Sequence, residues 1–343
     1  MQWMIKIMKK KKQWKMIPAL LIWVIIFASC KTDTKISEAA SGDPAVDQLT
    51  AQIADNQQDA SLYFQRANLY YEKGKYDYAI ADLKFAIKID SLNPEYRHLI
   101  SDAYLNYGHA QEAESALNDV LRLFPERIPT LLKLAELKYI LEEYDGSILT
   151  VNEIVRIDPQ NAEAYFMLGM DFLALKDQAR AINSFQTAVE LDSKLTDAWI
   201  YLGELYEERK DPKALQYYES AILSNPESMQ ARHAKAYYLQ NHNDIPGAIE
   251  LYRAIIIEDK SYTDAYLNSG ILYLELDSLD KAYEQFNLLV GINPTNHYGF
   301  YYRGVVNEKQ GKKEAALKDY SSAHNLNNQD KKVKEALESL KNR

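Results

Sequence analysis

The sequence of 343 residues is long enough for two or three ordinary domains, and its composition, with 47% hydrophobic and 26% charged residues, is that of a globular protein. A single cysteine excludes both an internal disulfide framework and a thiolate zinc site. The net charge of −9 would repel phosphate backbones, which argues against nucleic acid as a partner.

The first 29 residues are typical of an export signal. Six lysines and no acidic residue accompany a thirteen-residue apolar run from Met16 to Ala28. This run is shorter than the about 20 apolar residues that a membrane-spanning helix needs. We therefore expect residues 1–29 to be a signal peptide, with an uncut signal anchor as the alternative.

The only cysteine, Cys30, directly follows two small residues at the end of this run. The segment Phe27-Ala28-Ser29-Cys30 resembles the lipobox of bacterial lipoproteins, in which the cysteine thiol is acylated and the chain is cut before it. The resemblance implies that Cys30 is the lipidation site and that lipid anchors the chain in the bacterial cell envelope. Lys31 stands where some bacteria use aspartate for inner-membrane retention, so we expect the outer membrane, with the chain facing the periplasm. Residues 30–59 are expected to form a polar tether and an N-terminal cap.

From Ala60 onward the sequence can be laid out in blocks of 34 residues, of which the fifth is one residue short. The blocks are 60–93, 94–127, 128–161, 162–195, 196–228, 229–262, 263–296 and 297–328. Their eighth position is always small: Ala67, Ser101, Ala135, Gly169, Gly203, Ala236, Gly270 and Gly304. A second small residue follows twelve positions later in each block, shifted by one in the fifth. Small residues at both places let two antiparallel helices pack closely, so each block is predicted to be a helical hairpin.

This pattern resembles the tetratricopeptide repeat family, and it is matched best by Tyr165, Gly169, Ala181, Phe185 and Ala188. The resemblance covers residues 60–328 and implies an all-α fold, a right-handed α-solenoid of about eight helical hairpins. Residues 329–343 are expected to hold a C-terminal capping helix. Polar residues replace expected apolar ones at several positions, and we expect their stems to cover the core with their heads in water. These residues are Arg66, Arg97, Lys138, Arg232, Lys235, Arg303 and Asn307.

Tyrosine is unusually frequent, with 26 residues against 9 phenylalanines and 4 tryptophans. This balance suggests that one helical position takes the same amphipathic ring in many blocks.

In the resembled family, the first helix of each hairpin lines a concave groove that binds partners. Carried over position by position, the resemblance places in the groove Phe64, Asn68, Tyr71, His98, Asp102, Leu132, Glu136, Tyr139, Phe166, Met170, Ile200, Glu204, His233, Tyr237, Leu267, Ile271 and Tyr301. Exposed apolar and aromatic groups in such a row predict a binding site for an apolar or helical segment of a partner protein. The alternative is that single members of the row pack against the neighbouring repeat.

Some members of the family grip the carboxylate tail of chaperones with basic residues at fixed groove positions. Asn68 matches the asparagine of that clamp at position nine of the first block, but position five, where the clamp has lysine, is Phe64, and the next two blocks have His98 and Leu132 there. The clamp is therefore missing.

The sequence carries no glycine-rich phosphate loop, zinc-protease motif or nucleophile elbow, and the repeats leave no stretch for a catalytic domain. We therefore expect no enzymatic activity, no cofactor and no metal site. His98 and Asp102 lie one helical turn apart without a third partner, which favours a solvated pair over a ligand site. The expected function is a lipid-anchored scaffold for protein partners. A non-catalytic regulatory subunit or an assembly factor of a cell-wall, glycan-processing or outer-membrane protein machine remains the alternative.

Overall fold

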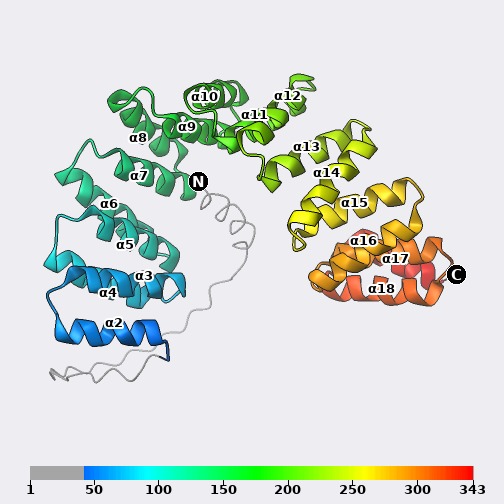
Figure 1. The fold of residues 1–343 in the computed structure, drawn as a ribbon, viewed down its shortest axis with the longest axis horizontal. Coiled ribbons are helices and arrows are strands. Elements are labelled where there is room, and N and C mark those ends of the chain that lie inside the picture. Colours follow the sequence, from blue (N-terminus) through cyan, green and yellow to red (C-terminus); the bar gives the residue numbers. More distant parts are fainter. Residues whose placement is uncertain (1–41, 343) are drawn as a thin grey trace. The chain divides into compact units, whose positions relative to one another are not determined.

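The computed structural model describes residues 42–342, in which every regular element is a helix (Figure 1). The all-α prediction is therefore confirmed for this part of the chain. The contacts divide the chain after Lys176 into two compact units, unit 1 and unit 2. The predicted signal peptide and Cys30 lie outside the described residues. Between residues 42 and 342, no helix is both long and apolar enough to cross a bilayer.

Unit 1 is built from one short helix followed by the helices of the first repeats. Its helices are α2 (Pro44–Asp55), α3 (Ala60–Glu72), α4 (Tyr76–Ile89), α5 (Pro94–Tyr107), α6 (Ala110–Leu123), α7 (Ile128–Ile140), α8 (Tyr144–Ile157) and α9 (Ala162–Ala174). Unit 2 holds α10 (Gln178–Leu191), α11 (Thr196–Glu208), α12 (Lys213–Ser224), α13 (Met229–Asn241), α14 (Ile245–Glu258), α15 (Thr263–Glu275), α16 (Leu279–Ile292), α17 (His297–Lys309), α18 (Lys313–Leu326) and α19 (Lys331–Lys341). The odd-numbered helices from α3 to α17 each begin at the first residue of a block.

The turn between the two helices of each repeat contains one residue in the left-handed region. Glycine fills this place in three repeats, at Gly74, Gly108 and Gly311. The other five repeats use residues with a side chain, namely Glu142, Lys176, Lys210, Asn243 and Asp277, with φ between 53° and 65°. The backbone course is thus common to all eight repeats, although only three of them carry the residue that adopts it without steric cost.

The small residue at the eighth position of a block lies against a large side chain on the second helix of the same repeat. A Cβ atom added to Gly203 would stand 2.5 Å from the Tyr218 ring, and one added to Gly270 would stand 2.6 Å from the Phe286 ring. Because real Cβ contacts are never this short, a bulkier residue would push the two helices apart. The sequence argument for close helix packing is thereby confirmed at these crossings.

Two of the polar departures pair with a carboxylate on the second helix, Arg66 in a buried pair and Arg303 in a half-buried one. Arg66 donates two hydrogen bonds to Asp82, both of 2.8 Å, and both side chains are less than a tenth exposed. Arg303 and Asp319, which are the same sixteen residues apart, form the equivalent pair at 3.0 and 2.6 Å. Asn307 is buried and donates to Asp319. The expectation of solvated heads was therefore wrong for Arg66 and Asn307, because a carboxylate on the second helix lies within their reach.

Helices outside the repeats cover the first and the last hairpin. Val46 and Ile53 of α2 are buried, and Thr50 of α2 accepts a hydrogen bond of 2.8 Å from Arg66. At the other end, α19 buries Val333, Leu337 and Leu340, and α19 packs against α18. The helix α19 therefore caps the last repeat of unit 2, as stacked repeats require.

Candidate protein-binding faces

The first helices of neighbouring repeats contact one another within each unit, and they carry all the predicted groove residues. The unit 1 face consists of Phe64, Asn68, Tyr71, His98, Asp102, Leu132, Glu136, Tyr139, Phe166 and Met170. The unit 2 face consists of Ile200, Glu204, His233, Tyr237, Leu267, Ile271 and Tyr301.

Three members of the unit 1 face are buried. The exposed fractions of His98, Phe166 and Met170 are 8%, 4% and 2%. The expectation that the whole row is exposed to a partner therefore does not hold for these three residues. The free energy of the folded protein falls when large apolar side chains such as Phe166 and Met170 leave water, and this favours their burial over exposure to a partner.

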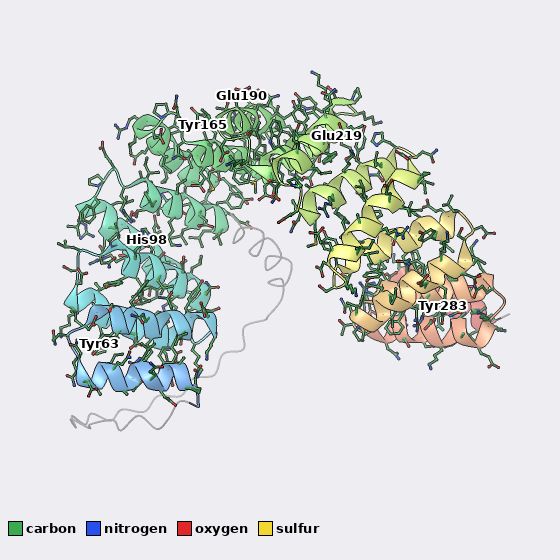
Figure 2. The ribbon with its side chains drawn as sticks, in the orientation of Figure 1. Tyr63, His98, Tyr165, Glu190, Glu219 and Tyr283 are labelled. Carbon is green, nitrogen blue, oxygen red and sulfur yellow. The ribbon has the colours of Figure 1, made fainter. Side chains whose placement is uncertain are left out.

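Polar side chains of the unit 1 face link α5 to α7. His98 on α5 (Figure 2) shares a hydrogen bond of 2.9 Å with the Thr130 hydroxyl, and Lys133 pairs with Asp102 at 2.8 Å. Burial lowers the pKa of His98 to about 4, so the imidazole is neutral at pH 7. Burial also raises the pKa of Asp102 and of Glu136. His98 and Asp102 thus each bind the next repeat rather than forming an acid-base pair with one another.

Aromatic and amide groups complete the unit 1 face. The Phe64 ring lies 5.1 Å from that of Tyr96, and Asn106 donates a hydrogen bond of 3.1 Å to the Tyr71 hydroxyl. The Tyr139 ring meets Tyr144 at 5.5 Å, and burial raises the pKa of Tyr139 to about 12. Phe64, Tyr71 and Tyr139 are half-buried, so these rings are only partly available to a partner.

The unit 2 face is more open. Tyr237 is 49% exposed and Glu204 is exposed, whereas the remaining members are half-buried. Adjacent first helices are tied together by Asn241, which donates to Glu207 at 3.3 Å, and by Asn268, which lies 3.2 Å from the His233 ring nitrogen. The face is therefore a continuous surface over α11, α13 and α15.

Tyrosine hydroxyl groups on the second helices form hydrogen bonds to the first helices that carry the unit 2 face. The rings of Tyr218, Tyr252 and Tyr320 on the second helices are buried, and their hydroxyl groups donate to the first helix of the same repeat. The acceptors are Glu207 at 2.8 Å, Gln240 at 3.2 Å and Glu308 at 2.8 Å. The expectation of one helical position that repeatedly takes an amphipathic ring is thereby confirmed in unit 2.

Sequence reasoning missed the three acceptors. All of them stand at the twelfth position of their block, so a tyrosine on the second helix together with Glu or Gln at that position could have revealed them. Because a buried hydroxyl needs a partner, the acceptors hold the tyrosine tips in fixed places beneath the face.

The described residues 42–342 contain no cluster of three or more histidine, cysteine, aspartate or glutamate side chains that could hold a metal ion. The faces instead offer apolar surface, carboxylates and hydrogen-bonding groups, which are the means of binding another protein.

Comparisons with known proteins agree with this architecture. Anaphase-promoting complex subunit 3 of Schizosaccharomyces pombe is 24% identical over 201 residues, which cover 58% of this chain and 30% of that protein. The Hsp70-Hsp90 organizing protein of Triticum aestivum is 22% identical over 255 residues, which cover 74% of this chain and 39% of that protein. The chain thus spans well under half the length of these two relatives.

A solved structure shares the fold. The crystal structure of the APC/C hetero-tetramer Cut9-Hcn1 matches with a TM-score of 0.53 at 16% identity, covering 86% of this chain and 58% of that one. The tetratricopeptide repeat family itself matches residues 64–128, 166–222 and 233–297, which together make up more than half of the sequence. Proteins of this family are protein-protein interaction scaffolds, and their fold is typically non-enzymatic. The chain belongs to the tetratricopeptide repeat family.

Proposed function

We propose that this protein is a lipid-anchored scaffold of the bacterial cell envelope that binds segments of partner proteins on its first-helix faces. The observation that carries the proposal is the open unit 2 face, where Tyr237 keeps 49% of its surface exposed between the buried Ala236 and Tyr238. Aromatic side chains supply much of the binding energy in protein interfaces. A large ring held outside the hairpin core is therefore suited to a partner.

The anchor rests on the sequence alone. Cys30 follows Ala28 and Ser29 at the end of an apolar run with a lysine-rich flank, as in bacterial lipoproteins. One acyl chain holds a protein to a bilayer only marginally, whereas two or more give durable attachment. A multiply acylated Cys30 would keep the repeats at a membrane without a spanning helix, and Lys31 favours the outer membrane.

Site-specific photo-crosslinking in living cells tests the binding proposal. A photoreactive residue at Tyr237 should form covalent adducts with envelope proteins. The same residue at Leu223 on α12, which is 83% exposed, is the matched control and should form few adducts. Adducts from Leu223 alone would contradict the assignment of the first-helix face as the binding surface.

Cys30→Ala tests the anchor. The variant should lose incorporation of labelled palmitate and either accumulate as a precursor or appear free in the periplasm, while the helical circular dichroism stays unchanged. Density fractionation of the wild-type protein should place it with the outer membrane. A wild-type protein whose mass starts at Met1 with an unmodified Cys30 would exclude lipidation.

A further inference from the structure

The unit 2 face carries carboxylates that the fold leaves without a cation. Glu204 on α11 and Asp264 and Glu275 on α15 are exposed, and none of them forms an ion pair within residues 42–342. Asp264 lies close enough to His233 on α13 for its negative charge to favour the protonated form of the imidazole. Burial is the largest cause of the raised pKa of Tyr302 on α17, and the charge of Glu275 contributes to it. The three carboxylates therefore lie on two first helices of the face, α11 and α15.

The helices α11 and α15 carry no lysine or arginine, and three cations on the neighbouring first helices α13 and α17 are already engaged. Arg232 pairs with Glu258, Lys235 pairs with Glu219 at 2.9 Å, and Arg303 pairs with Asp319 at 2.6 Å. All three acceptors lie on second helices. The hairpins thus use the positive charges for their own packing and leave an excess of negative charge on the face.

Apolar groups lie among these carboxylates. Tyr237 is half exposed, and Leu267, Ile271 and Leu274 are half-buried on the neighbouring helix α15. Ile271 and Leu274 also pack at the edge of the cluster around Phe286, so their positions are fixed by the core. The face therefore presents a preformed apolar strip beside negative charge.

The electrostatics of α11 favour a positive partner. The pKa of Glu204 is raised to about 7, first because the surrounding protein removes part of its hydration and then because Glu207 and Glu208 repel its charge. A cation placed beside Glu204 would offset this repulsion, whereas an acidic or phosphorylated segment would increase it.

We propose that the unit 2 face binds a segment of a partner protein in which lysine or arginine residues flank apolar side chains. The apolar side chains lie on Tyr237, Leu267 and Ile271, and the cations pair with Glu204, Asp264 and Glu275. This inference rests on the proposed function and adds the chemistry of the partner. Burial of the apolar strip supplies affinity, and the carboxylates supply selection by charge.

The test measures how the full chain, held in detergent, binds a synthetic amphipathic peptide of leucine and lysine and its matched peptide of leucine and glutamate. The combined variant Glu204→Gln, Asp264→Asn and Glu275→Gln should weaken lysine-peptide binding about tenfold, which corresponds to about 1.4 kcal/mol for the three exposed charge pairs together. Tyr237→Ala should also weaken it. Circular dichroism checks that each variant keeps its helices.

A second triple variant controls for net charge. Glu190→Gln, Glu250→Gln and Glu284→Gln remove the same charge from exposed positions on the second helices α10, α14 and α16; Glu190 is labelled in Figure 2. This control should leave binding of the lysine peptide within about twofold of the wild type. Equal weakening by both triple variants, or equal binding of the glutamate peptide, would overturn the inference.

The oligomeric state of the unliganded chain separates a foreign partner from a second copy. The wild type and the first triple variant should have the same mass by light scattering. A wild-type dimer that the triple variant dissociates would show that the face holds a second copy of this chain, which would overturn the inference. None of these outcomes alters the crosslinking result at Tyr237, so the proposed function is judged separately.

Discussion

The two units reach the same close helix packing with different pairs of side chains. In unit 1 the small position of a repeat is Ala67, Ser101 or Ala135, and the residue sixteen positions later is leucine or valine. In unit 2 glycine at positions 203, 270 and 304 lies against the ring of Tyr218, Phe286 or Tyr320. A larger side chain on one helix is thus matched by a smaller one on the other, which is what close packing of the interior requires.

One repeat of unit 2 departs from this rule and shows what the tyrosines add. Ala236, not glycine, stands in the repeat whose second helix carries Tyr252. The Tyr252 hydroxyl donates to Gln240 and accepts from Asn268, both at 3.2 Å. Asn268 belongs to the following repeat, so this hydroxyl joins two repeats as well as filling space. Unit 2 therefore differs from unit 1 in hydrogen bonding beneath its face, and not only in the volume of its core side chains.

Removing the arginine of an ion pair between the two helices of a repeat should have the largest effect on stability. Arg66→Met removes the guanidinium that pairs with the buried Asp82, and the free energy of unfolding should fall by about 3 to 5 kcal/mol. Arg303→Met should cost less, because Arg303 is half-buried whereas Arg66 is buried, and because Asp319 keeps its hydrogen bond of 2.9 Å from Asn307. Urea unfolding followed by circular dichroism measures both. Equal losses in the two variants would show that Asn307 does not compensate, and Arg66→Met with Asp82→Leu should recover much of the loss.

Replacing glycine with alanine, where two helices cross and on an open helix surface, should separate the effect of packing on stability from that of helix propensity. Gly270→Ala places a Cβ atom 2.6 Å from the Phe286 ring and should destabilise unit 2 by up to about 3 kcal/mol. Gly291→Ala on α16 is the matched control, because its Cβ meets no atom within 4 Å. That substitution should instead stabilise the protein by about 0.5 to 1 kcal/mol. Thermal unfolding measures the two changes, and a shift of the same sign in both would refute the packing argument.

Stability should depend on pH through Asp171 of unit 1. Its side chain is fully buried, one carboxyl oxygen accepts from Ser147 at 2.8 Å, and the other has no hydrogen-bond partner. Burial raises the pKa of Asp171 from 3.8 to about 7. The stability that this group contributes is therefore complete below about pH 4 and is lost as pH rises through 7.

Asp171→Asn should remove this pH dependence, because the amide has no charge to bury. Relative to the variant, the wild type should lose about 3 to 4 kcal/mol between pH 4 and pH 8. Melting temperatures measured across this range provide the comparison. Parallel curves for the two proteins would show that Asp171 titrates at its ordinary pKa. Tyr139 and Tyr144, which lie near Asp171, have pKa values raised by burial and stay neutral in this range.

The smallest expected effect concerns the tyrosine hydroxyl groups of unit 2. Tyr252→Phe keeps the ring but removes the hydrogen bonds to Gln240 and from Asn268, which should cost about 1 kcal/mol. The amide protons of α15 should then exchange faster, since α15 carries Asn268. Unchanged exchange in Tyr252→Phe would show that the hydrogen bond between the Tyr252 hydroxyl and Asn268 does not stabilise α15.

The sequence alone determined the helical elements and their order. The period of 34 residues and the small eighth position depend on which residues meet at each helix crossing, and this contact recurs in every repeat. The first helices accordingly begin at Ala60, Pro94 and the later block starts. Local sequence also marks the turn between paired helices, where Gly74, Gly108 and Gly311 take the left-handed conformation.

The tertiary structure decided which polar and groove residues are buried. Arg66 and Asp82 lie on different helices, and only the docked hairpin brings the guanidinium within 2.8 Å of the carboxylate. His98 and Phe166 have the groove position in the repeat pattern but are buried, because exposure depends on every neighbouring side chain and not on position within a block. The unpaired charge on the unit 2 face was hidden for the same reason. From the sequence, Glu204 and Lys235 are both charged residues on a first helix. Only the fold shows that Lys235 forms an ion pair with Glu219, whereas Glu204 forms none within residues 42–342.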